Sequence, residues 1–170
     1  RFGVVTLTRC PQAFVRARIE LPNGRSAWGG AAELMAPKWF DKDLALSNED
    51  NFEQLRHALL AARAAYLSQA QPDAAFGHFA RHYQPLIDAG AEHGRNALVS
   101  CYGPALLDRA ILDGLCRALG LSFYDAMKHN VVGMDARLTP DLAGFDAARF
   151  LSGLVPATSI ELRHTVGLLG

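Results

Sequence analysis

The chain has 170 residues, of which 50% are hydrophobic and 20% are charged. This balance is typical of a globular protein with a buried core and argues against a disordered chain. The 17 basic and 17 acidic residues give a net charge of zero, and no block of like charge favours nucleic acid or an anionic membrane as a partner. The apolar runs are shorter than the roughly 20 residues that a membrane-spanning helix needs.

Three stretches of the first third are predicted as strands, namely 2–8, 13–21 and 26–32. In the second stretch, residues such as Val15 alternate with residues such as Arg16, which predicts one apolar and one polar face. Asn23 and Gly24 supply the positive φ angles that a tight hairpin needs. Short links between three strands predict an antiparallel meander.

Helices are predicted for most of the remaining chain, over 47–71, 74–83, 105–119, 122–128 and 146–153. Ser47 is a favourable N-cap for the first of these helices. Pro104 suits the first turn of the third helix, and Gly120 suits its C-cap. Pro85 and Gly90 are expected to break the chain after the second helix. The sequence therefore predicts an α+β fold.

The last predicted element is a strand over 158–165, followed by the apolar residues 166–170. An apolar strand without a neighbour leaves backbone groups unpaired, which complete domains avoid. Two interpretations remain: the strand joins the first sheet, or the sequence stops part-way through a larger protein. We expect the second.

Three cysteines lie far apart in the sequence, at Cys10, Cys101 and Cys116. Their number and spacing give neither a disulfide framework nor a zinc site, so we expect a reducing, cytoplasmic location. Cys101 could form a nucleophile pair with a histidine, but a small buried thiol is the favoured interpretation.

Two pairs of residues have the spacing of a possible site. His78 and His82 are four apart on a predicted helix, but the third metal ligand and the Glu of an HExxH motif are missing. We expect them to be solvated or capping histidines. Asp108 and Asp113 are five apart and point in different directions, so Asp108 is expected to pair with a neighbouring Arg and Asp113 to bond locally. The glycine motifs that cradle phosphates and the GxSxG elbow are absent.

The predicted loop over 35–46 contains the strongest surface candidates, Lys38, Trp39 and Phe40. Aromatic side chains on a loop can close over a ligand and exclude water. The alternative is that both rings anchor the loop to the core, and the sequence leaves the two roles open.

Two segments together resemble the capping domain of the enolase superfamily, in its mandelate racemase and muconate lactonising branch. The first runs from residues 1–8 through the strand at 14–20 and the Asn-Gly turn to Ala-Trp-Gly-Gly-Ala at 27–31. The second, residues 107–120, is similar to the helix written A-x-x-D-L-x-G-K-x-x-G. Gly30 stands where the branch often has Glu, Arg117 replaces Lys, and Leu121 stands where Pro is common.

The resemblance implies a capping domain over 1–153, with a meander at 1–34, a loop at 35–46 and helices at 47–153. Residues 154–170 would hold the first strand of a truncated (β/α) barrel that is otherwise absent. The C-terminal ends of barrel strands face the active site, so Arg163, His164 and Thr165 become candidates, with an ordinary strand as the alternative.

The family reaction is the removal of a proton α to a carboxylate, with Mg²⁺ stabilising the intermediate. The resemblance places the bases and the three carboxylate ligands for Mg²⁺ on barrel strands that would follow Gly170. The complete protein is expected to be a racemase, dehydratase or cycloisomerase and a homo-oligomer, and this segment alone to lack catalytic and metal-binding residues. The implied partners are a small carboxylate substrate and the rest of the barrel.

A different class of function also fits the sequence. The chain could be a stand-alone α+β binding or interaction module that uses the aromatic loop at 38–42 as its contact surface.

Overall fold

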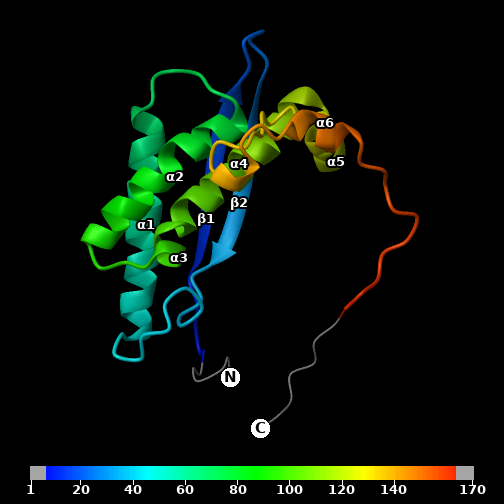
Figure 1. The fold of residues 1–170 in the computed structure, drawn as a ribbon. Coiled ribbons are helices and arrows are strands. Elements are labelled where there is room, and N and C mark those ends of the chain that lie inside the picture. The colour runs from blue at the N-terminus through cyan, green and yellow to red at the C-terminus, as the bar shows by residue number, and fades with distance from the viewer. Residues whose placement is uncertain (1–6, 164–170) are drawn as a thin grey trace.

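The computed structural model describes residues 7–163 of the chain. Its elements in order are β1 (Gln12–Glu20), β2 (Ser26–Leu34), α1 (Asn48–Ser68), α2 (Ala75–Glu92), α3 (Ala97–Ser100), α4 (Tyr102–Leu119), α5 (Phe123–Lys128), the 3-10 turn η1 (Pro140–Leu142) and α6 (Ala147–Ser152). The two strands form an antiparallel hairpin, α4 lies across it, and α1 and α2 lie beside α4 (Figure 1). The fold is therefore α+β.

The predicted hairpin is confirmed, but the positive φ angle predicted for Asn23 is wrong, and of the two turn residues only Gly24 has one. Gly24 has a φ of 80°, and the Arg25 N–H donates to the Asn23 side chain at 3.1 Å, which closes the turn. Along β1, Val15 and its alternate neighbours are partly buried beneath α4, while Arg16 and Arg18 are exposed. The alternation in the sequence therefore identified the buried face correctly.

The prediction of a three-stranded meander is wrong, because the sheet formed by the described residues has two strands. Of the predicted strand at 2–8, residues 2–6 lie outside the described residues, and the last two are not in a strand. Pro11 accepts a bond from the Met35 N–H at 2.9 Å but has no N–H to return. Before it, Arg9 pairs with Glu49 in the first turn of α1, at 2.8 Å. The described residues before β1 therefore reach it from the side of α1 and do not run along the sheet as a third strand.

The helices begin and end close to the predicted residues, with one exception. Ser47 forms a capping box with Asp50, and Gly120 ends α4 with a φ of 69°. The predicted break after residue 83 is wrong, because α2 continues through Pro85 to Glu92. Gly90 does not break the helix either: a Cβ there would lie 1.9 Å from the Ser100 Oγ, so the glycine allows α2 to approach α3.

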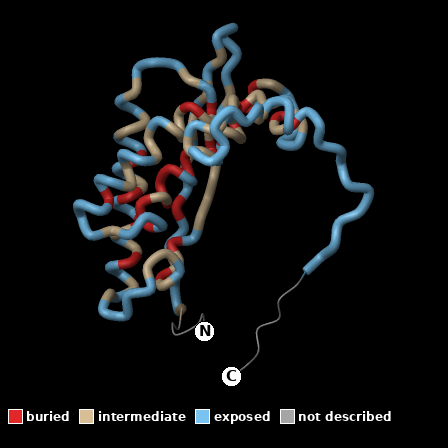
Figure 2. The backbone as a smooth tube through the Cα atoms, viewed as in Figure 1, coloured by how far each residue is buried: buried red, intermediate tan, exposed pale blue. Residues whose placement is uncertain are grey.

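The main core lies where α1, α4 and the hairpin meet (Figure 2). Its fully buried members include Leu55 of α1, Val99 of α3 and Leu106 of α4. The hairpin touches α4 backbone to backbone: a Cβ on Gly29 would lie 2.1 Å from both the Ala110 carbonyl oxygen and the Gly114 nitrogen. A second cluster joins Ala75, Leu115 and Val132 below α2.

Residues 154–163 leave the body of the molecule as an extended segment (Figure 1). Residues 158–163 form no strand, and the rest of the predicted strand lies outside the described residues. Val155, Ile160 and Leu162 are 84%, 81% and 92% exposed. The predicted barrel beyond α6 stays a prediction. Within 7–163, no helix combines the length and hydropathy needed to cross a membrane.

Candidate functional site

Lys38 organises the loop that follows β2. Its backbone has a φ of 60°, and its N–H donates to the Oδ1 of the buried Asn51 at 3.1 Å. Its ammonium donates to the carbonyl oxygens of Asp43 at 2.7 Å and Leu46 at 2.5 Å. These bonds fold the loop onto itself, so the Lys38 side chain has a structural role.

The two aromatic residues of the loop have different surroundings. Phe40 packs edge to face on Tyr102, with ring centroids 5.2 Å apart, and its carbonyl accepts a bond from the Asn96 side chain. Trp39 is 58% exposed. Phe40 therefore anchors the loop, while Trp39 remains on the surface where a ligand could meet it.

A small cleft of about 150 Å³ lies beside this loop, lined by Glu33, Phe40, Leu98, Cys101, Tyr102, Ala105 and Arg109. Glu33 and Arg109 form an ion pair across it at 3.0 Å. Burial raises the pKa of the Cys101 thiol, so this side chain is protonated at neutral pH and is a poor nucleophile.

The paired histidines of α2 do not form a metal site. The His82 Nε2 is 2.8 Å from the Gln69 Oε1, and its ring stacks on Tyr66 with centroids 4.6 Å apart. Across residues 7–163, no three histidine, cysteine or carboxylate side chains come together in a way that could hold a metal ion. The side chains described therefore do not fit the magnesium site of the enolase superfamily.

The two aspartates of α4 have separate environments. Asp113 accepts bonds from Arg117, one turn on, and from the Gly30 N–H of β2 at 2.9 Å. Asp108 forms no ion pair with any residue in 7–163, so its predicted pairing with an Arg is not found there. Burial raises the pKa of the Asp108 carboxyl.

The candidates at the end of the chain are not assembled into a site. Arg163 is exposed on the extended segment, away from the helices. His164 and Thr165 lie outside the described residues. All three remain predictions.

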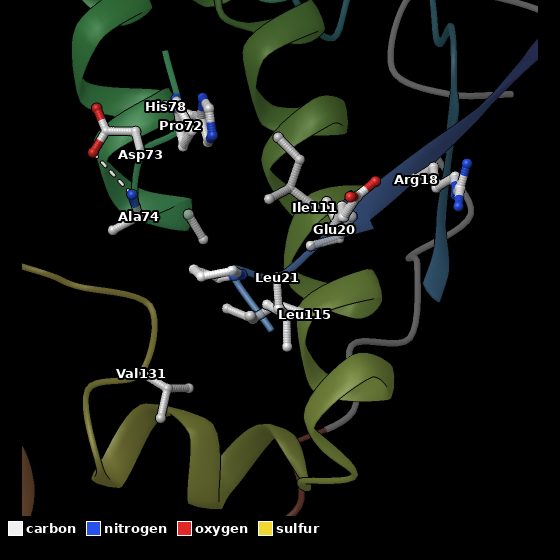
Figure 3. A pocket seen from close by; sticks show the side chains of 13 residues that line it. Arg18, Glu20, Leu21, Pro72, Asp73, Ala74, His78, Ile111, Leu115 and Val131 are labelled. Carbon is white, nitrogen blue, oxygen red and sulfur yellow. Dashed lines mark hydrogen bonds between the residues drawn. The ribbon is translucent and has the colours of Figure 1, made fainter. Parts of the chain in front are cut away.

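The structure also contains a groove that the sequence did not reveal, and we call it the β1 groove. Its first part, of about 490 Å³, lies between the end of β1, the start of α2 and α4, with His78 of α2 opposite Ile111 of α4 (Figure 3). Its second part, of about 630 Å³, runs on between β1 and α1. The two parts share Arg18, Ile19, His78 and Ile111.

Burial in the β1 groove disfavours the charged form of two side chains, Tyr66 and His78. The Tyr66 hydroxyl is buried and has no hydrogen-bond partner within the described part of the chain. Burial raises its pKa. Burial also lowers the pKa of His78. In the sequence, two features point to this groove: a strand with a neighbour on one side only, and apolar residues on the outer side of α1.

The burial of His78 predicts a stability that falls in acid. Its pKa in the folded chain lies below the ordinary value of 6.5, so the unfolded chain binds the proton more tightly. Stability that is fully present above the unfolded pKa is lost as the pH falls through that value towards the folded pKa. We expect His78→Gln to reduce this acid-induced loss, measured by urea unfolding at a series of pH values between 5 and 8.

His57, exposed on α1, provides the control for this measurement. The acid-induced loss of stability in His57→Gln is expected to exceed that in His78→Gln. An equal acid-induced loss in the His78 variant and the unmodified chain would contradict the prediction.

No family model, no curated protein and no solved structure matches the chain.

Proposed function

We propose that this chain is the substrate-capping and specificity region of a magnesium-dependent enzyme of the enolase superfamily. The enzyme would act by removing a proton α to a carboxylate, as a racemase, dehydratase or cycloisomerase. The proposal places the general base and the magnesium ligands on residues other than those described, and it includes a small carboxylate substrate, a homo-oligomer and a cytoplasmic location.

The observation that carries the proposal is the arrangement of the loop at 35–46. Capping domains of that family carry loops that close over the substrate and set specificity, and by the resemblance residues 33–42 of this chain occupy the position of one of them. Lys38 and Phe40 hold the backbone of this loop in place, and Trp39 stays exposed. A fixed loop that presents one large ring is suited to cover a substrate, exclude water and limit its size.

The contact between the two segments that carry the resemblance gives further support. They lie more than 70 residues apart in the sequence, at 27–31 and 107–120. Gly29 lies against Gly114, and the Gly30 N–H donates to Asp113 at 2.9 Å. The two segments that resemble the family therefore contact each other and belong to one structural unit.

Trp39→Ala tests the proposed role in the enzyme that contains this chain. We expect a raised KM or an altered preference among carboxylate substrates, with the midpoint of thermal unfolding almost unchanged, because the indole is on the surface. Phe40→Ala is the matched comparison and is expected to lower the free energy of unfolding by about 2 kcal/mol, because it removes a partly buried ring. Steady-state kinetics and thermal melts of both variants provide the measurement.

Two results would contradict the proposal. If Trp39→Ala changed only thermal stability, Trp39 would be an anchor and not part of a lid. If residues 1–170 alone exchanged the α-proton of a carboxylate in deuterated water with Mg²⁺, followed by NMR, catalysis would lie within this chain.

The exposure of Trp39 also favours the second candidate, a stand-alone interaction module with residues 38–42 as its contact surface. The state of the chain in solution separates the two. A stand-alone module should be monomeric by light scattering, whereas a capping region should self-associate through the exposed apolar residues of 154–163.

A further inference from the structure

Among residues 7–163, no strand pairs with the edge of β1 that faces away from β2. The Leu21 N–H donates to the Arg25 carbonyl oxygen at 2.8 Å, and the Met35 N–H donates to that of Pro11 at 2.9 Å. Each of these bonds joins two directly opposed residues, and the residues that flank β1, Leu21 and Pro11, are odd-numbered. Because hydrogen-bonded pairs alternate along an antiparallel ladder, the odd-numbered residues of β1 exchange hydrogen bonds with β2. Successive residues of a strand point their N–H and C=O groups to opposite edges, so Phe14, Arg16 and Arg18 direct theirs to the open edge.

The opposite edge of the hairpin, formed by β2, has a hydrogen-bond partner in α4. There, Asp113 of α4 accepts a bond from the Gly30 N–H of β2. Within the part of the chain that the structure describes, no strand lies along β1 on its outer side. Unpaired strand edges are the usual templates for the addition of another strand.

An apolar surface lies next to this open edge. The second part of the β1 groove continues from β1 onto α1, where its walls include Leu59, Leu60 and Leu67. At its rims, Phe14 is 74% exposed and Leu67 is 71% exposed. A strand added to β1 would lie over α1, and its inward side chains would bury the leucine side chains of α1.

The charge of the groove identifies the kind of strand that fits. Arg16, Arg18 and Arg63 line its second part, and no Asp or Glu does. Arg16 lies over the Trp28 ring at 4.6 Å, and Arg18 donates to the Ser26 hydroxyl. Within residues 7–163, none of the three arginines has a carboxylate partner. An incoming segment with acidic side chains would supply the missing carboxylates.

The same charges disfavour a second copy of β1 at this edge. Pairing of two β1 strands would bring Arg16 and Arg18 of both copies together, and like charges opposite each other are destabilising. The occupant that fits is therefore a different, acidic segment.

We propose that the β1 groove binds an extended, acidic segment of a partner protein, which adds to β1 as a strand. Its outward side chains are carboxylates opposite Arg16 and Arg18, and its inward side chains are apolar and fill the groove against α1. The inference is independent of the proposed capping function, because the loop at 35–46 plays no part in it.

The probe is a fluorescein-labelled peptide in which valine alternates with glutamate, with a length that matches the nine residues of β1. We expect saturable binding by fluorescence polarisation. Arg18→Glu should weaken it by about tenfold, since an attraction becomes a repulsion, and should improve binding of the matching valine–lysine peptide. Arg25→Glu changes the net charge equally but lies in the turn outside the groove, so it should change affinity less than about twofold. Circular dichroism establishes that each variant is folded.

A second peptide, N-methylated at alternate residues on the side that would face β1, tests strand addition itself. Loss of binding is expected, because the peptide can no longer donate to the carbonyl oxygens of Phe14, Arg16 and Arg18 and its methyl groups hold it away from β1. Equal binding of both peptides, or an equal loss in the Arg18 and Arg25 variants, would overturn the proposal. Dimerisation of the chain that the peptide abolishes, seen by analytical ultracentrifugation, would also overturn it by making a second copy the occupant.

Discussion

Gly29→Ala is expected to lower the free energy of unfolding by about 3 kcal/mol, the upper end of the range for overpacked sites. The added methyl would lie 2.1 Å from the Ala110 oxygen and from the Gly114 nitrogen. Both are backbone atoms of α4, so no side chain can rotate away to relieve the contact. Helix and hairpin would have to separate, which also weakens the bond between Asp113 and Gly30. Urea unfolding followed by circular dichroism measures the effect.

Gly30→Ala is the matched control, one residue along the same strand. A methyl there lies 3.7 Å from the Val15 carbonyl oxygen, an ordinary van der Waals distance. The variant should therefore unfold within about 0.5 kcal/mol of the unmodified chain. Equal destabilisation by the two substitutions would mean that the hairpin does not contact α4 as described.

Leu106→Ala is expected to destabilise the chain by about 4 kcal/mol. Leu106 is fully buried and lies in the main core with Leu55 and Val99, between the hairpin and the helices. Its truncation removes apolar contacts on several sides and leaves a cavity that the close-packed surroundings cannot fill. The midpoint of urea unfolding gives the change in stability.

Leu44, at 72% exposed, provides the comparison for the same chemical change. Leu44→Ala should change the free energy of unfolding by less than about 0.5 kcal/mol. Similar losses of stability in the two leucine variants would mean that Leu106 does not lie in the main core.

The elements set by local chemistry were predictable. Asn23 and Gly24 define the turn of the hairpin, and the alternation in β1 defines its buried face. Ser47 and Gly120 mark helix ends because capping acts within a few residues of the chain. These are the positions where sequence and structure agree best.

The errors arose where distant contacts outweigh local preference. Pro85 removes one N–H from α2, but the helix continues because it packs on α3 and α4, with Gly90 at the closest approach. Of the strand predicted at 2–8, the described residues 7 and 8 are not in a strand, and Pro11, which has no N–H, stands between them and β1.

The sequence predicted where the loop lies but not the contacts that its residues make. The sequence located the loop at 35–46, but it could not show that Asn51, more than ten residues on, would bond to Lys38. Nor could it separate Phe40 from Trp39, because the difference depends on Tyr102 in α4. The β1 groove is lined by residues of β1, β2, α1, α2 and α4, so no single stretch of the sequence predicts it.

The bonds of Lys38 have a consequence for how this protein can diversify. Because its ammonium closes the loop on the loop's own carbonyl oxygens, position 38 fixes much of the backbone path of the loop. If the loop has the proposed role in specificity, single substitutions elsewhere in it would alter ligand preference on an unchanged framework.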